Sequence, residues 1–276
     1  MTQSDRTILI TGASSGIGLA SATLLRSRGW RVLATARKAE DLARLESLGF
    51  EALPLELGDP ASVAACATAA LERTGGKLSA LFNNAAYGQP GAVEDLTVDV
   101  LKAQFEVNLF AWHDLTRRIV PAMRKAGRGR IVQCSSVLGF IAPPYRGAYN
   151  ASKHALEALS DSMRFELRGS GVLVSIIEPG PIETRFVANA IEALRRNVRF
   201  DGSPHEAEYQ RRLEAMQAGG KKRGKLPPEA VAWKLLHAVE SARPKVRYRV
   251  TTATHMAALG KRLLPPSLMD ILIRTS

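Results

Sequence analysis

The feature that most constrains the fold is a regular alternation between short, largely apolar runs and longer amphipathic stretches. Strands that are apolar along their whole length, without a polar face, are typical of parallel strands covered on both sides. This strand–helix alternation predicts an α/β protein, a doubly wound sheet of about seven mostly parallel strands with helices on both faces. The runs expected to form strands cover residues 7–11, 32–36, 52–57, 78–82, 130–134, 172–177 and 245–251.

The length of the chain, 276 residues, suits a single domain over residues 1–276. The alternation breaks down at about 182–226 into helix-like pieces and charged linkers, and an insertion of this length after a strand predicts a substrate lid. A tail at about 252–276 carries spaced apolar residues. We expect this tail to be a docking pair of helices or a contact between subunits, with peripheral membrane attachment as the alternative.

The formal net charge of +12 raises the question of a nucleic acid or an anionic membrane as partner. The basic residues are spread along the chain, and their densest stretch, between Arg195 and Lys225, also contains acidic residues. Because no nucleic-acid motif accompanies them, we expect a solvated or cofactor-attracting surface and no nucleic-acid partner.

The N-terminal residues run directly into the first strand without a leader, and no apolar run is long enough to span a bilayer. We therefore expect a cytoplasmic protein.

Cys66 and Cys134 lie in different elements, and the apolar surroundings of Cys134 predict a buried thiol. No cluster of cysteines and histidines has the spacing of metal ligands, so we expect no metal.

A glycine-rich loop joins the first expected strand to the first expected helix. Glycines allow a tight turn and let the backbone approach a pyrophosphate without a clash at Cβ. The free N–H groups and the dipole of the following helix then stabilise the negative charge. Its position predicts that the loop binds a dinucleotide through Gly12, Ser14, Ser15, Gly16, Ile17 and Gly18.

The end of the second expected strand indicates which dinucleotide. In such folds an acidic residue there bonds the adenosine ribose and favours NAD. Here Ala36 is followed by Arg37 and Lys38, so no carboxylate repels a 2′-phosphate and a guanidinium can grip one. The sequence therefore predicts NADP(H) rather than NAD(H).

Tyr149 and Lys153 are four residues apart on one expected helix and so share a face. An ammonium ~4 Å from a phenol contributes about 4 kcal/mol at an effective dielectric constant of ~20. That is enough to lower the phenol pKa by roughly 3 units, toward 7, before desolvation opposes it. Ser136 closes the fifth expected strand, where ligands bind in these sheets, and can hydrogen-bond the substrate oxygen that Tyr149 protonates.

This combination of residues resembles the short-chain dehydrogenase/reductase family, with its Rossmann-type fold, over residues 5 to 255. The stretch 175–186 looks most like the branch of retinol and 17β-hydroxysteroid dehydrogenases, and the likeness to bacterial NADP-dependent aldehyde reductases extends into residues 261–265. The motifs that carry the resemblance are Thr11-Gly12-x-x-x-Gly16-Ile17-Gly18, Asn83-Asn84-Ala85, Asn108, Ser136, Tyr149-x-x-x-Lys153 and Pro179-Gly180-Pro181-Ile182-x-Thr184.

The resemblance implies roles for these residues. Tyr149 would be the acid/base, Lys153 would also bind the nicotinamide ribose, Ser136 would orient the carbonyl, and Asn108 would hold a water that links Lys153 to solvent. Glu56 and Leu57 stand where the family places an Asp beside adenine, and Ala86 replaces a frequent Gly. The other residues implied to contact the cofactor are Asn84, Ala85, Pro179, Gly180, Ile182 and Thr184, with Ser14 near the 2′-phosphate.

The apolar residues before the Tyr149 helix, from Phe140 to Tyr145, predict together with Phe186 and Val187 an apolar substrate pocket. We expect reversible, NADPH-dependent reduction of a medium- or long-chain aldehyde, or of a retinal- or steroid-like carbonyl. A reductase of carrier-bound 3-ketoacyl groups and a non-catalytic NADP-binding sensor stay as alternatives. The resemblance also implies a homodimer or homotetramer.

Overall fold

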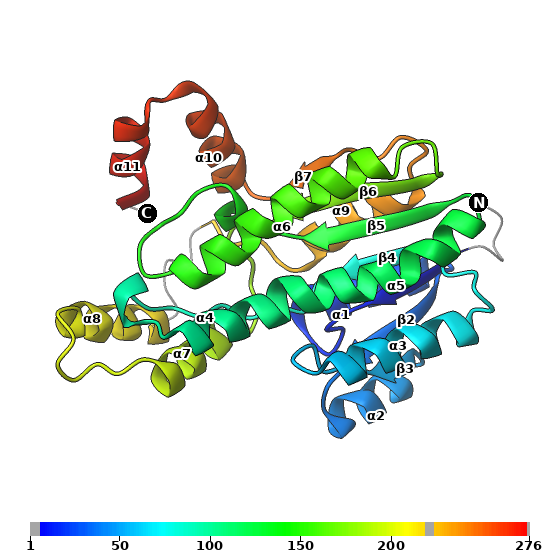
Figure 1. The fold of residues 1–276 in the computed structure, drawn as a ribbon, viewed down its shortest axis with the longest axis horizontal. Helices are drawn as coiled ribbons and strands as arrows, with labels where there is room; N and C mark the ends of the chain where they lie inside the picture. The colour runs from blue at the N-terminus through cyan, green and yellow to red at the C-terminus, as the bar shows by residue number, and fades with distance from the viewer. Residues whose placement is uncertain (1–5, 219–223, 275–276) are drawn as a thin grey trace.

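The computed structural model describes residues 6–218 and 224–274. Residues 1–5, residues 219–223 of the expected lid and the last two residues of the tail lie outside them. One seven-stranded sheet forms the centre of the molecule, in the order β3-β2-β1-β4-β5-β6-β7, and all of its neighbouring strands are parallel (Figure 1). Its strands are β1 (Thr7–Ile10), β2 (Arg31–Ala36), β3 (Glu51–Pro54), β4 (Ala80–Asn83), β5 (Gly129–Cys134), β6 (Val172–Glu178) and β7 (Arg247–Arg249).

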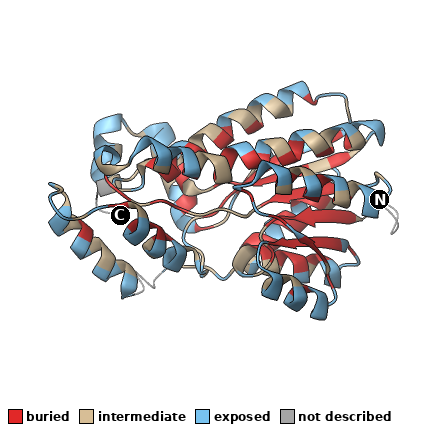
Figure 2. Cartoon of the chain, turned by 60° about the horizontal axis from the view of Figure 1, so that its bottom comes forward, coloured by how far each residue is buried: buried red, intermediate tan, exposed pale blue. Residues whose placement is uncertain are grey.

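The expected doubly wound sheet is confirmed, and burial explains why its strands lack a polar face. Every residue of β1 and of β4 is buried, and Figure 2 shows buried residues along the strands and on the helix faces that cover them. The two edge strands differ most from the expected ranges. β3 ends at Pro54, opposite Ala36 at the end of β2, and β7 pairs only through Arg247–Arg249.

Helices cover both faces of the sheet. On one face α1 (Gly16–Ser27) packs against α9 (Glu229–Glu240), and on the other α3 (Pro60–Arg73) packs against α5 (Ala111–Lys125). In Figure 1, α5 lies across the front of the sheet beside α6 (Gly147–Glu166). The shorter α2 (Ala39–Ser47) packs on β2 and β3.

The amphipathic residues 98–125 do not form one uniform helix. They form α4 (Val98–Phe105), a turn of π-helix at Glu106–Phe110, and α5. A π-helical turn adds one residue to the helical repeat and is frequent at functional sites, because it re-aims the side chains around it. Asn108 is the central residue of this turn and is fully buried.

The two segments after β6 and β7 are helical. The expected lid contains α7 (Phe186–Asn197) and α8 (Glu206–Gln217), and the tail contains α10 (Thr252–Leu263) and α11 (Pro266–Arg274). Both pairs lie beyond the carboxyl ends of the strands (Figure 1). A separate small apolar cluster joins Leu194, Val198 and Tyr209 of the lid to Ala92. Within the described ranges, no helix has both the length and the apolar character needed to cross a membrane.

Candidate active site

The order of the strands reverses between β1 and β4, and the residues predicted to form a site gather at this reversal. Four loops meet there, after β1, β4, β5 and β6. Thr11 N donates to the Phe82 carbonyl at 3.0 Å, and Val137 N donates to the Pro179 carbonyl at 2.8 Å. The fold therefore brings together residues that are separated by more than a hundred positions.

The glycine loop is packed so tightly that side chains do not fit. Gly12 (φ +67°) and Gly16 (φ +52°) adopt the left-handed conformation that favours glycine. A Cβ on Gly12 would lie 2.7 Å from Cβ of Ala85, and a Cβ on Gly18 would lie 2.1 Å from the Gly12 carbonyl oxygen. The three glycines thus bring the first turn of α1 close to the loop after β4.

The start of α1 fits a phosphate. Its N-cap, Ser15, makes no side-chain capping hydrogen bond to the first N–H groups of the helix. The first turn of the helix contains no acidic residue, so the positive end of its dipole is uncompensated there. Together with the bare glycine backbone, these N–H groups are suited to the pyrophosphate of a dinucleotide.

Two threonine hydroxyls hold the loop in place. Thr11 Oγ1 accepts hydrogen bonds from the backbone N–H groups of Asn84 at 2.8 Å and Ala85 at 3.0 Å, and Asn84 Nδ2 donates to the Thr11 carbonyl at 3.0 Å. Thr35 Oγ1 accepts from Gly12 N at 3.2 Å. These roles of Thr11 and Thr35 were not predicted from the sequence, in which their only signal is their position at the carboxyl ends of adjacent strands.

Arg37 is exposed, and among the described residues no side chain or carbonyl accepts a hydrogen bond from it. The neighbouring Lys38 pairs with Glu40 at 3.2 Å. A second guanidinium, not predicted from the sequence, lies in the same region: Arg44 Nη2 of α2 donates to the Ser14 carbonyl and to Asp41 at 3.0 Å. Arg44 therefore ties α2 to the glycine loop.

At the end of β3, Glu56 is exposed and Leu57 is buried. The carboxylate of Glu56 accepts a hydrogen bond from Gly58 N at 3.2 Å, within its own turn. The roles predicted for Glu56 and Leu57 beside adenine stay predictions.

Tyr149 is almost completely buried, with 8% of its surface exposed. Its ring packs against that of Phe186, the first residue of α7, with the ring centroids 5.3 Å apart. Ser136 Oγ accepts from Leu138 N at 3.1 Å, and the proximity of this hydroxyl acts to lower the pKa of the Tyr149 phenol. The structure thus brings Ser136 and Tyr149 together, as the sequence predicted.

Lys153 is also buried, and its ammonium group contacts a backbone carbonyl and the face of an aromatic ring. Its Nζ donates to the Cys134 carbonyl at 2.8 Å and lies 4.2 Å from the centroid of the Trp112 ring, in a cation–π contact. Burial lowers the pKa of Lys153 to about 8. This brings the ammonium group into a range where it can exchange a proton near neutral pH.

The expectation that Lys153 lowers the pKa of Tyr149 is wrong for the chain by itself. Burial raises the pKa of Tyr149 well above its usual value, because a phenolate is poorly solvated there. Cys134 raises it further, whereas Ser136 and Arg146 oppose the rise. Lys153 lies 5.7 Å from the centroid of the Tyr149 ring, and its ammonium is directed to the Cys134 carbonyl instead.

Asn108 is bound to the backbone of Tyr87. Its Oδ1 accepts from Tyr87 N at 3.2 Å, and its Nδ2 donates to the Tyr87 carbonyl at 2.8 Å. Nearby, Trp112 Nε1 donates to the Ala85 carbonyl at 2.9 Å. The π-helical turn and α5 thus fix the loop after β4, and the predicted water-holding role of Asn108 stays a prediction.

The loop after β6 closes the site from the other side. A Cβ on Gly16 would lie 3.1 Å from the methyl group of Thr184, so Thr184 borders the glycine loop. Ile182 pairs with Leu226 in a short parallel bridge, and Pro179 accepts the hydrogen bond from Val137 described above. Gly180 is held beneath the start of the tail, since a Cβ there would lie 2.0 Å from Oγ1 of Thr251.

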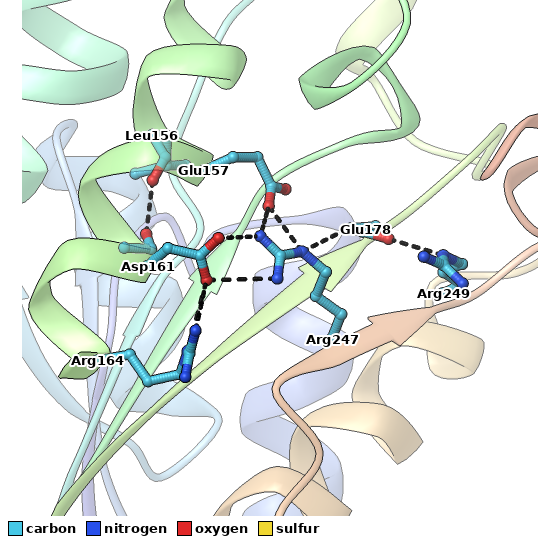
Figure 3. A network of polar contacts seen from close by, with 8 residues as sticks. Leu156, Glu157, Asp161, Arg164, Glu178, Arg247 and Arg249 are labelled. Atoms are coloured by element: carbon cyan, nitrogen blue, oxygen red, sulfur yellow. Dashed lines mark hydrogen bonds and ion pairs between the residues drawn. The ribbon is translucent and has the colours of Figure 1, made fainter. Parts of the chain in front are cut away.

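A network of ion pairs anchors α6, the helix that carries Tyr149 and Lys153 (Figure 3). Arg247 of β7 contacts three carboxylates: Glu157 at 3.1 Å and Asp161 at 2.6 Å, both on α6, and Glu178 of β6 at 3.2 Å. Arg249 contacts Glu178 at 3.2 Å. Burial raises the pKa values of Glu157 and Glu178, and the arginines oppose that rise. The network therefore joins α6 to the far edge of the sheet.

The fold and this site define a class of α/β proteins that bind a nucleotide where the strand order reverses. The family described as short chain dehydrogenase matches residues 6–195 of the chain. The chain belongs to the short-chain dehydrogenase family and is an oxidoreductase, so the resemblance found in the sequence is confirmed.

Relatives match over nearly the whole chain. The uncharacterized oxidoreductase YbbO of Escherichia coli is 43% identical over 98% of this chain and 94% of its own length. The NADPH-dependent 3-dehydrocapnine reductase of Ornithobacterium rhinotracheale is 33% identical, over 96% and 95% of the two chains. Retinol dehydrogenase 8 of Bos taurus is 32% identical, over 100% and 90%.

A solved structure agrees with the fold. The short-chain dehydrogenase/reductase of Burkholderia phymatum, in complex with NAD, superposes with a TM-score of 0.79 at 29% identity. The match covers 99% of this chain and 97% of the other.

Proposed function

We propose that this protein reduces an apolar aldehyde or ketone to the alcohol, reversibly, with NADPH as the hydride donor. One observation carries the proposal: a buried tyrosine, whose pKa the neighbouring Ser136 acts to lower and which lies one helical turn from a buried lysine, stands beside a glycine loop suited to a pyrophosphate. This arrangement supplies a proton donor and a binding group for a carbonyl oxygen next to a dinucleotide site.

The residues of the chain have distinct roles in this reaction. The Ser136 hydroxyl donates a hydrogen bond to the carbonyl oxygen, and the Tyr149 hydroxyl gives its proton to that oxygen as negative charge develops there. NADPH, when bound, supplies the hydride. Because burial raises the pKa of Tyr149, the phenol keeps its proton at neutral pH until the substrate takes it. Lys153, whose pKa is lowered to about 8, is suited to restoring that proton.

The test is Tyr149→Phe, which removes only the phenolic oxygen. We expect kcat/KM for carbonyl reduction to fall by about 10²–10⁴-fold, because the proton donor is lost, while NADPH still binds. NADPH oxidation would be followed by absorbance, and cofactor binding by fluorescence titration. Turnover that survives in this variant would contradict the proposed mechanism.

The preference for NADP(H) rests on Arg37. No described side chain competes for its guanidinium, and the residue before it, Ala36, has no carboxylate. A relative is named as NADPH-dependent, whereas the superposed Burkholderia enzyme holds NAD. A bidentate contact from Arg37 to the 2′-phosphate would decide between the two cofactors.

For Arg37→Ala we expect the ratio of kcat/KM for NADPH to that for NADH to fall about 10-fold or more, since one charge-assisted phosphate contact contributes ~1.5–3 kcal/mol. Arg243→Ala is the matched control, because it removes an exposed arginine beyond α9 and is expected to keep the ratio. A ratio that Arg37→Ala leaves unchanged would assign the preference to other residues.

The apolar character of the substrate is supported by Phe186, which packs on Tyr149, and by Phe140 and Ile141 in the loop before α6. Residues 182–226 would then act as the lid over the substrate. The likeness to a retinol dehydrogenase favours the same class of carbonyl. A homodimer or homotetramer is supported by large apolar side chains exposed on α10 and α11 and around the π-helical turn, where Phe110 is 50% exposed.

A further inference from the structure

Tyr145 has a backbone conformation that is usual only for glycine. Its φ angle is +62°, and among the residues that the structure describes it is the only one other than glycine with a positive φ. A side chain in this left-handed region crowds the backbone, so the conformation persists only where the surroundings hold it. Tyr145 lies four residues before Tyr149, at the entry to α6. The contacts that hold Tyr145 therefore bear on the position of the proton donor.

The strained turn is continuous with the first turn of α6. The Tyr145 carbonyl accepts a hydrogen bond from Gly91 N at 3.0 Å, and Gly91 pairs with Arg146 in a short parallel bridge. The Arg146 carbonyl in turn accepts from Asn150 N at 2.8 Å, inside the helix. A change in the backbone at Tyr145 would therefore displace the helical turn that carries Tyr149.

The side chain of Tyr145 is held by α8 of the lid. Its hydroxyl lies 2.9 Å from Nδ1 of His205, the N-cap residue of α8, and the centroids of the two rings are 5.4 Å apart. Tyr209 meets the Tyr145 ring edge-on, with the centroids 6.0 Å apart. The guanidinium carbon of Arg212, which is paired with Glu208 at 2.5 Å, lies 4.1 Å from the centroid of the Tyr145 ring in a cation–π contact. Three side chains on one face of α8 thus contact the strained residue.

The start of α8 is anchored in turn to the segment before α4. His205 Nε2 lies 2.6 Å from a carboxylate oxygen of Glu94, so the histidine bridges this carboxylate and the strained residue. The Tyr209 hydroxyl donates to Asp95, which also accepts from Ser203 Oγ at 2.7 Å. Both acidic side chains of this segment therefore have partners in the lid, and these contacts fix α8 beside the entry to α6.

We propose that Tyr145 is a positioning residue for Tyr149, held in its left-handed conformation by the α8 side chains that contact it. The inference rests on the proposed carbonyl reduction, in which Tyr149 is the proton donor, and adds the element of the fold that places this donor. Proton transfer needs the donor within hydrogen-bond distance of the substrate oxygen, and a displacement of about 1 Å can lower the rate about 10²-fold. The lid thereby acts on the reaction through α8, which does not touch the reacting atoms.

A pair of substitutions separates the strained backbone from the side-chain contacts. Tyr145→Ala and Tyr145→Gly both remove the side chain that contacts α8, but only alanine has the Cβ that makes the left-handed conformation unfavourable. With NADPH and octanal as substrates, we expect kcat to fall about 10-fold or more in Tyr145→Ala and to be at least about 3-fold higher in Tyr145→Gly than in Tyr145→Ala. The dissociation constant of NADPH should stay within about 2-fold in both, because neither substitution touches the glycine loop. An equal loss of kcat in the two variants, or no loss in Tyr145→Ala, would overturn the inference.

A substitution on α8 tests whether the lid supplies the support. His205→Ala leaves Tyr145 in place but removes its hydrogen bond, so we expect kcat to fall about 5-fold in the wild-type background. In the Tyr145→Gly background the fall should be less than about 2-fold, because glycine needs no support. His113→Ala is the matched control, because it removes an exposed histidine of α5, and is expected to keep the wild-type kcat. Equal losses in both backgrounds would overturn the inference, and since His205 is only partly buried, this variant decides the matter if Tyr145→Ala does not fold.

Hydrogen exchange gives a readout that needs no turnover. Amide exchange in residues 146–153 of the full-length protein would be followed by mass spectrometry. We expect about 10-fold faster exchange in Tyr145→Ala and His205→Ala, and a rate near that of the wild type in Tyr145→Gly. Wild-type exchange in both Tyr145→Ala and His205→Ala would overturn the inference even where turnover falls. If the wild type reduces no carbonyl while exchange changes as expected, the proposed function fails and the placement of α6 by Tyr145 stands.

Discussion

At the scale of single residues, Lys153 carries a charge in a place that water does not reach. Only 1% of its surface is exposed, and one carbonyl and the face of one indole ring replace its hydration shell. Burial lowers its pKa from the usual 10.5 to about 8, so the folded protein binds this proton less tightly than the unfolded chain does. The buried ammonium group of Lys153, which suits proton exchange, therefore lowers the free energy of unfolding.

Lys153→Met should abolish turnover and stabilise the fold at pH 7. The lowered pKa of Lys153 corresponds to a destabilisation of about 3 kcal/mol, which the substitution removes. The substitution also removes the hydrogen bond to Cys134, worth about 1 kcal/mol, and the cation–π contact, worth a similar amount. We therefore expect the free energy of unfolding to rise by about 1 kcal/mol. Denaturant titrations of both proteins would measure it.

The pH dependence of this gain has a definite sign. Between pH 8 and 10.5 the unfolded chain holds the lysine proton and the folded chain releases it, so wild-type stability rises with pH across this window. The advantage of Lys153→Met should therefore shrink over the same range. Lys102→Met, on the exposed surface of α4, should show neither effect, and a destabilised Lys153→Met protein at pH 7 would contradict the argument.

At the scale of elements, the junction between β1 and α1 depends on close contact of backbone with backbone. The Gly12 carbonyl occupies the place where a Cβ on Gly18 would stand, at 2.1 Å, and a main-chain carbonyl has no flexible end that could move aside. A side chain here would push the first turn of α1 away from the loop after β4. The helix would still form, since Gly18 lies within it, but its N-terminus would no longer face the site expected for the pyrophosphate.

We therefore expect Gly18→Ala to weaken NADPH binding by about 10-fold or more and to lower the free energy of unfolding by about 1–3 kcal/mol, the usual range for overpacking. Fluorescence titration and chemical denaturation would measure the two effects. Gly58→Ala is the control, because the nearest heavy atom to a Cβ at that position is 3.7 Å away. Wild-type affinity in Gly18→Ala would show that the contact relaxes at no cost.

At the scale of the whole molecule, the C-terminal tail has two parts with different relations to the rest. Its start is structural: Thr251 and Thr254 are buried, their hydroxyls are 3.0 Å apart, and they pack against Gly180 in the loop after β6. Lys261 of α10 also donates to the Phe140 carbonyl. By contrast, α11 exposes Leu268, Ile271 and Leu272.

A chain that ends at residue 264 should therefore keep its Tm and its NADPH affinity within about 2-fold. A chain that ends at residue 251 should lose several degrees of Tm, since each kcal/mol corresponds to about 2–4 °C in a protein of this size, and should bind NADPH more weakly. Thermal denaturation and cofactor titration of both chains would measure this. Equal losses in the two chains would show that α11, too, supports the fold.

Much of the site was predictable because its chemistry is local in the sequence. The glycine loop, Ser136 and the Tyr149–Lys153 pair lie at strand ends or on one helical face, and the structure places them as expected. The roles of Thr11, Thr35 and Arg44 were missed, because each depends on a hydrogen bond to a segment elsewhere in the chain. No residue pattern reports such a bond.

The sequence by itself determined the class of fold, because strands without a polar face must be covered on both sides and only a parallel, doubly wound sheet achieves this along such a chain. Only the tertiary structure decided the electrostatics of the site. Spacing placed an ammonium beside a phenol, but burial raised the pKa of Tyr149, and the fold directed the Lys153 ammonium to the Cys134 carbonyl. The physical reason is that the energy of a charge depends on its surroundings in three dimensions, which the order of residues does not specify.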